Sequence, residues 1–167
     1  MKRNFLLIAA FVGGLLFASC GENKDATFMK EADDMFSQAE TELQGIDNLD
    51  DFCTLYANLL EQKSELAQKM MEAYAVDDTS AKVPDEVSQH IYNRATEYNK
   101  VEAEKFAELF TPLLDELEAA VEAKDKAAVE SAFEAIIPYA NYDNVVPELQ
   151  ERYQVIQAGL IEMGIIL

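Results

Sequence analysis

The forty residues from Asp85 to Lys124, DEVSQHIYNRATEYNKVEAEKFAELFTPLLDELEAAVEAK, decide the fold class. Apolar residues recur in this stretch every three or four positions, which is the period of one face of an α-helix. The apolar positions on this face are Val87, Ile91, Ala95, Tyr98, Phe106, Leu109, Leu113, Leu117 and Val121. Pro84 suits the first turn of this helix. Pro112 is expected to kink the helix, or to divide it with Thr111 as the cap of the second part.

The helical period also runs through the residues that precede this stretch. It predicts a first helix over residues 27–44, ended by Gly45, and a second helix over residues 50–75. Asp47 and Asn48 are candidate caps for the second helix, because short polar side chains accept hydrogen bonds from the first amides of a helix.

After the long helix, Asp125 is expected to cap a further helical segment. The stretch from Pro138 to Pro147 should break this segment, because it also contains turn-forming Asn and Asp residues. A last helix is predicted over residues 147–164. No segment shows the strict alternation of apolar and polar residues that is typical of a strand.

The predicted fold is therefore all-α. Because the connections are short, consecutive helices should be antiparallel neighbours. We expect an up-and-down bundle of four helices whose last helix is broken near residues 138–147, and an irregular five-helix array is the alternative. One such domain is expected to cover residues 27–167.

Size and charge narrow the possible functions. The chain has 167 residues, with 13 Lys and Arg against 32 Asp and Glu, and a formal net charge of −19. Binding to nucleic acid through its phosphates is excluded by this excess of acids. Half of the residues are apolar and only four are Pro and six Gly, so the chain is expected to fold as one domain and not to be a disordered acidic tail.

The first residues have the features of a signal peptide. A basic start at Lys2 and Arg3 is followed by an apolar stretch from Phe5 to Phe17. A helix of 13 residues is only about 20 Å long, whereas the hydrocarbon core of a membrane is about 30 Å thick. The stretch therefore indicates the apolar region of a cleaved signal peptide.

The sequence Phe17-Ala18-Ser19-Cys20 at the end of this stretch resembles the lipobox of bacterial lipoproteins. Phe17 departs from the leucine that is usual at its place. The resemblance implies that signal peptidase II removes residues 1–19. It also implies that Cys20 then carries a diacylglyceryl thioether and an N-acyl chain, which anchor the protein to a membrane.

The residues after Cys20 bear on the location of this anchored protein. In similar lipoproteins an Asp after the Cys keeps the protein in the inner membrane, and here that residue is Gly21. The resemblance thus favours the outer membrane of a Gram-negative envelope. Residues 22–25 are similar to acidic signals that export some lipoproteins to the cell surface, so a periplasmic and a surface location both stay open. Residues 20–26 would form a short tether, and the mature chain would have a net charge of about −21.

The sequence lacks the motifs of common enzyme classes. Glycines outside the signal peptide stand only at positions 21, 45, 159 and 164, so neither a P-loop, nor a dinucleotide-binding motif, nor a Gly-x-Ser-x-Gly elbow can be formed. Carboxylates are so numerous that adjacent pairs do not single out a catalytic acid and base. We therefore expect a protein that is not an enzyme.

Cofactor sites are not expected either. His90, the only histidine, lies four residues after Glu86 and should share a solvated helix face with it, whereas zinc sites need three or four ligands. Haem attachment through Cys-x-x-Cys-His is excluded because the motif is missing. Cys53 is expected to be a buried small apolar side chain.

One segment stands out as a candidate interaction patch. Tyr139, Asn141, Tyr142 and Asn144 combine a helix break with aromatic and amide side chains, and aromatic side chains are enriched in binding hot spots. The other tyrosines are expected at the edges of the bundle, with their hydroxyls in water.

The sequence as a whole favours a membrane-anchored lipoprotein that acts as a non-enzymatic interaction or structural module. Its expected partners are the membrane, through Cys20, and an envelope protein with a neutral or basic surface. The alternative is a carrier or sensor that holds a small ligand, a metal or haem between its helices. A pocket that reaches Tyr98 or His90 would favour the carrier, and an interior filled by apolar side chains would favour the scaffold.

Overall fold

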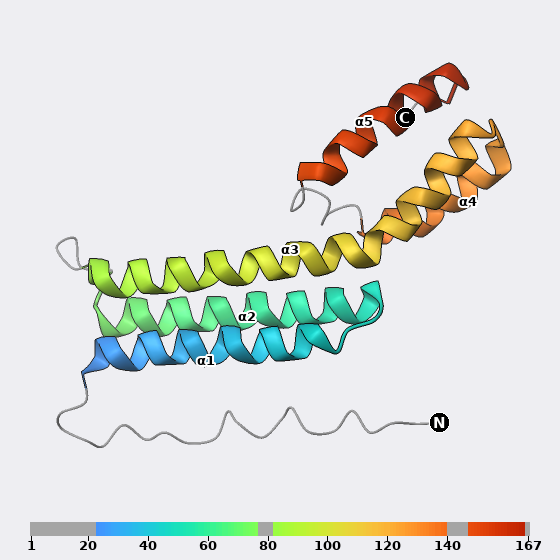
Figure 1. Ribbon diagram of the computed structural model, residues 1–167. Coiled ribbons are helices and arrows are strands. Elements are labelled where there is room, and N and C mark those ends of the chain that lie inside the picture. The colour runs from blue at the N-terminus through green and yellow to red at the C-terminus, as the bar shows by residue number, and fades with distance from the viewer. Residues whose placement is uncertain (1–22, 77–81, 140–146, 166–167) are drawn as a thin grey trace.

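The computed structural model describes residues 23–76, 82–139 and 147–165, and within these residues the chain forms α-helices and no strand (Figure 1). The helices are α1 (Lys24–Gln44), α2 (Leu49–Ala73), α3 (Asp85–Glu122), α4 (Lys126–Ile136) and α5 (Pro147–Glu162). A short 3-10 helix, η1 (Ile137–Tyr139), follows α4 directly. The predicted all-α class is confirmed.

The long helix α3 takes part in two groups of helices. Its first half runs beside α1 and α2, and its second half continues past their ends to α4 and α5 (Figure 1). Two clusters of buried side chains correspond to these groups, and we call them the first core and the second core.

The first core joins α1, α2 and the first half of α3. It consists of Phe28, Ala32, Phe36, Ala39, Leu59, Leu66, Met70, Tyr74, Val87 and Tyr98. The second core joins the end of α1 and the start of α2 to the second half of α3, α4 and α5. It consists of Leu43, Leu49, Phe52, Leu55, Phe106, Phe110, Leu114, Leu117, Ala120, Val129, Ala132, Ile136, Leu149, Ile156 and Leu160.

The helix count agrees with the five-helix alternative and not with a four-helix bundle whose last member is broken. Helices α4 and α5 run in opposite directions, and each of them packs against α3 (Figure 1). They are therefore two helices of a compact array and not two halves of one helix. The chain changes from α4 to the 3-10 helix at Ile137, and the next residue, Pro138, lacks the amide hydrogen that an α-helix needs.

Side-chain caps set the starts of three helices. Asn48 accepts a hydrogen bond from the amide of Asp51 at 2.9 Å and caps α2, as predicted. Asp125 accepts from the amides of residues 127 and 128 and caps α4, also as predicted. Helix α1 starts at Lys24, three residues before the predicted start, because Asn23 accepts from the amide of Asp25. Residues 24–26, which were expected to belong to the tether, are therefore part of α1.

Pro112 does not divide α3. The helix is continuous from Asp85 to Glu122, and its axis changes direction in the second half, which contains Pro112 (Figure 1). Thr111 does not act as a cap, since its hydroxyl donates to the carbonyl of Ala107, one turn earlier, at 2.6 Å. Of the two predicted outcomes, the structure shows the bend.

Candidate functional site

The structure describes only part of the predicted site. Cys20, Asn141, Tyr142 and Asn144 lie outside the described residues, and Tyr139 lies within them. Among the helices of the described ranges, none combines the length and the apolar character that crossing a membrane requires. Tyr139 is therefore the one residue of the predicted patch whose surroundings the described residues show.

Tyr139 joins the end of α4 to the start of α2. It is the last residue of η1, and its hydroxyl donates a hydrogen bond to Asp50 Oδ1 at 2.7 Å. This hydrogen bond is the main reason why the pKa of Tyr139 is raised above its usual value. The half-buried ring is thus held in place by a residue 89 positions away in the chain.

An open groove of about 440 Å³ lies beside this ring. We call it the Tyr139 groove. Its walls come from the turn between α1 and α2, from α3 on both sides of Pro112, and from α4 and η1. The lining residues are Asp47, Asn48, Leu49, Asp50, Leu109, Pro112, Leu113, Glu134, Ala135, Pro138 and Tyr139. Apolar side chains from α3 and η1 are therefore accompanied by three carboxylates and by no basic side chain.

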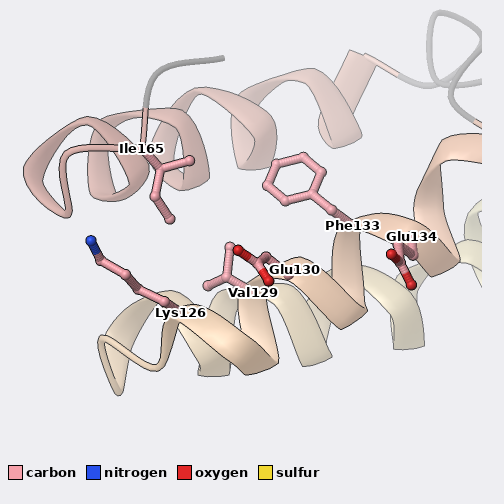
Figure 2. Close-up of a pocket in the computed structure, with 6 residues that line it drawn as sticks. All are labelled: Lys126, Val129, Glu130, Phe133, Glu134 and Ile165. Carbon is pink, nitrogen blue, oxygen red and sulfur yellow. The ribbon is translucent and has the colours of Figure 1, made fainter.

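A second groove, of about 410 Å³, runs between α4 and the residues that follow α5. Figure 2 shows Phe133 and Ile165 pointing into it from opposite sides, with Lys126 at one end and Glu134 at the other. Its lining contains both a base and acids, so it lacks the single sign of charge that characterises the Tyr139 groove.

Two arginines clamp neighbouring helices together. Arg94 of α3 makes a bidentate pair with Glu40 of α1, at 2.8 and 3.0 Å. Arg152 of α5 makes a similar pair with Glu118 of α3, at 2.9 and 2.7 Å, and also contacts Asp115. Both guanidinium groups are largely shielded from solvent. Because such bidentate pairs fix geometry, these residues set how α1 and α5 lie on α3.

The surroundings of His90 and Cys53 differ from the predictions. His90 Nε2 lies 2.9 Å from Asp33 Oδ1 of α1, so its partner is on another helix and is not Glu86. Cys53 is half-buried and packs against the second core, where full burial was expected. Within the described ranges, no three His, Cys, Asp or Glu side chains come together in a way that could hold a metal ion.

A buried polar group lies between the two cores. Glu102 of α3 is only 5% exposed, and it follows Tyr98, which is fully buried, by one helical turn. Neither Oε1 of Glu102 nor the hydroxyl oxygen of Tyr98 has a hydrogen-bond partner in the described part of the chain. The ammonium of Lys63 from α2 lies over the rings of Phe36 and Tyr98, 5.4 and 5.6 Å from their centres.

Burial dominates the electrostatics of this group. It raises the pKa of Glu102, and the attraction of the nearby Lys63 ammonium opposes that shift. Burial likewise lowers the pKa of Lys63, against the attraction of Glu102. The pKa of Tyr98 is raised, first by burial and then by the charge of Glu102. In each case the charged form is disfavoured because it loses contact with water.

The sequence analysis did not single out Glu102, although a signal was present. Tyr98, Glu102, Phe106, Phe110 and Leu114 follow one another at steps of four, and all five are buried. A carboxylate that interrupts an apolar stripe at helical spacing is a candidate for burial. In a chain with 32 acids, only its register with the stripe distinguishes Glu102 from the others.

Comparison of the chain with protein-family models, with curated proteins and with solved structures found no match.

Proposed function

We propose that this chain is a lipoprotein of a bacterial cell envelope and that it acts as a non-enzymatic interaction module. In this proposal Cys20 carries the acyl chains that hold the protein on the outer membrane, and the helical array is displayed beside that membrane. The observation that carries the anchoring is the basic and apolar segment that ends in Ala18-Ser19-Cys20.

The charge of the helical body fits this arrangement. A strongly acidic body is repelled by anionic lipid head groups, so a tether and not the body would make the membrane contact. The body then stays available to a protein partner whose surface is neutral or basic.

The Tyr139 groove is the surface that we propose for this partner. It offers the apolar side chains Leu109, Leu113 and Pro138 next to the carboxylates of Asp47 and Glu134. Apolar anchors surrounded by polar groups of one sign are typical of protein-binding surfaces. Tyr139 of the predicted patch lines the groove, and the other patch residues lie outside the described residues.

The packing of the two cores supports a scaffold more than a carrier. Large apolar side chains fill both cores, and eleven of the largest side chains among the described residues are less than 2% exposed. Neither of the two grooves described above is lined by Tyr98 or His90, the residues that a ligand-holding pocket was expected to reach.

The anchor is tested with the Cys20→Ala variant of the full chain. The expected result is loss of acylation, seen by mass spectrometry, and loss of the protein from the membrane fraction. Cys53→Ala is the matched control, because Cys53 belongs to the helical body, and it should leave fractionation unchanged. Unchanged membrane fractionation of Cys20→Ala would rule out the lipoprotein.

The groove is tested by reversing its charge. In Asp47→Lys/Glu134→Lys both changed side chains are exposed, so the fold should be kept. Co-purification of partners from the native envelope should be at least about tenfold lower with this variant than with the wild type. Binding by the wild type should weaken as the salt concentration rises. Glu61→Lys/Glu65→Lys is the matched control, because it makes the same change of charge on an exposed part of α2. Equal capture by both variants would exclude the groove as the binding surface.

A further inference from the structure

Three helices contribute to the polar group between the two cores. Helix α1 supplies Phe36, α2 supplies Lys63, and α3 supplies Tyr98 and Glu102. The Phe36 and Tyr98 rings lie 5.6 Å apart, and the Lys63 ammonium covers both of them. Lys63 therefore places the charge of α2 directly over the contact between α1 and α3.

Glu102 is the buried ionisable group beside this contact. When a buried carboxyl is neutral it needs little solvation, whereas a buried carboxylate without full hydrogen bonding is strongly destabilising. Glu102 is buried and its Oε1 has no hydrogen-bond partner among the described residues. The Lys63 ammonium is the positive charge that acts on Glu102, and its attraction only partly offsets the effect of burial.

We propose that Lys63, Tyr98 and Glu102 form a pH-responsive clasp that holds α2 against α1 and α3 and that loosens when Glu102 loses its proton. The proposal does not depend on the lipid anchor or on a partner at the Tyr139 groove. Glu102, a buried charged residue that a purely structural scaffold does not need, thereby has a role.

The charged groups around the clasp affect the ionisation of Glu102. From α1, the carboxylates of Glu40 and Glu42 act on Tyr98, and Glu40 is itself paired with Arg94. From α2 comes Lys63, and from α3 comes the Tyr98 hydroxyl. The nearby α1 groups are thus negative or already paired, and they do not help Glu102 to ionise.

The direction of the pH effect follows from the shift of Glu102. Its pKa in the folded protein is raised above that of an ordinary glutamate. The clasp is therefore fully stable below the ordinary value, and its stability falls as pH rises from there through the raised pKa. At pH values between the ordinary and the raised pKa, the folded state holds one more proton than the opened state. The opening constant therefore increases up to about tenfold per pH unit.

Hydrogen exchange of the full chain tests the clasp. Opening constants of α2 amides, corrected for the intrinsic exchange rate, are compared between the wild type and Glu102→Gln from about pH 4.5 to pH 7. We expect the ratio of wild type to Glu102→Gln to rise with pH for the α2 amides and to stay constant for the α4 amides. A ratio that does not change with pH, or that changes equally in α4, would overturn the proposal.

A second experiment tests the part played by Lys63. Lys63→Met keeps an apolar stem over the two rings and removes the charge. We expect the pKa of Glu102, followed by carboxyl carbon NMR, to rise further than in the wild type. Lys69→Met is the control. It removes a surface charge of the same helix, one that pairs with Glu31, and it should leave the pKa of Glu102 unchanged.

The combined variant Lys63→Met/Glu102→Gln keeps this second test decisive if Lys63→Met is poorly folded. It should restore the fold, because no buried carboxylate is then left without its cation. An ordinary glutamate pKa for Glu102 in both the wild type and Lys63→Met would overturn the proposal, and so would a failure of the combined variant to restore the fold.

Discussion

The two cores of this protein are stabilised in different ways. The first core ends at a buried carboxylate, and the Lys63 cation lies over two of its aromatic rings. An arginine–glutamate pair joins helices in each group, Arg94–Glu40 in the first and Arg152–Glu118 in the second. The second core is built from apolar side chains in close contact, including the stacked rings of Phe106 and Phe110, whose centres lie 5.0 Å apart. Both cores share α3.

This difference predicts different sensitivities. Ionic contacts respond to pH, and close apolar contacts respond to the size of side chains. The first core should therefore tolerate changes of volume better, and the second core should be largely indifferent to the charge of Glu102. Mutations placed in pairs, one in each core, can test this contrast.

The largest expected effect is that of Phe110→Ala in the second core. Phe110 is fully buried between Phe106 and the ring of Tyr153, so its removal leaves a cavity that close neighbours cannot fill. We expect a loss of about 3–5 kcal/mol in the free energy of unfolding. Urea denaturation measures the loss. Phe28→Ala, at the edge of the first core where the ring is 9% exposed, should cost less, and an equal cost would contradict the contrast between the cores.

The next effect concerns a close approach between α5 and α3. A Cβ atom at Gly159 of α5 would lie 2.3 Å from Val121 Cγ1 of α3, and Val121 cannot move easily because its side chain is β-branched. We expect Gly159→Ala to cost about 1–3 kcal/mol through this overlap. Gly45→Ala at the end of α1 is the control. Its new Cβ would meet only the Glu42 carbonyl at 3.5 Å, so it should be neutral or slightly stabilising.

Helix caps are expected to have a smaller effect. Asp125→Ala removes the acceptor for two amides of α4, and we expect a cost of about 1 kcal/mol in thermal or urea unfolding. Asn48→Ala at α2 is the matched variant, since its side-chain oxygen caps one amide. Helix α4 has 11 residues and α2 has 25. The helical circular dichroism signal should therefore begin to fall earlier in the unfolding transition of Asp125→Ala than in that of Asn48→Ala. Identical unfolding curves would contradict this.

Much of the fold could be predicted because it depends on local chemistry. The caps at Asn48 and Asp125 and the limits of the long helix follow from single residues and from apolar spacing. The buried face in the second half of α3 was harder to predict. Phe110, Leu114 and Ala120 are buried there, and the predicted positions at 109, 113 and 121 are only half-buried. Because α3 packs against both α4 and α5 in this half, its apolar surface is wider than one stripe.

The candidate site was less predictable because its contacts join residues that are far apart in the chain. Tyr98 was expected at an edge with its hydroxyl in water, and it is fully buried. His90 contacts Asp33, which is 57 positions away. The apolar spacing places Tyr98 and Glu102 on the inner face of α3, but only the packing of α1 and α2 shows that they are covered. Tyr139 was predicted correctly as a residue at a helix break, but its bond to Asp50 was not.

The smallest expected effect is that of Tyr139→Phe, which tests whether this bond fixes the Tyr139 groove. The variant keeps the ring and removes the hydroxyl that donates to Asp50. Because the hydrogen bond is exposed to solvent, we expect a cost of about 0.5 kcal/mol or less in unfolding. The local effect should be larger: amides at the start of α2 and the end of α4 should shift together in NMR spectra. Asp50→Ala, which removes the acceptor, should produce a similar set of shifts if the bond is what joins these segments. Shifts confined to η1 would show that the groove keeps its form without the bond, and that the packing of Pro138 and Leu113 alone sets its shape.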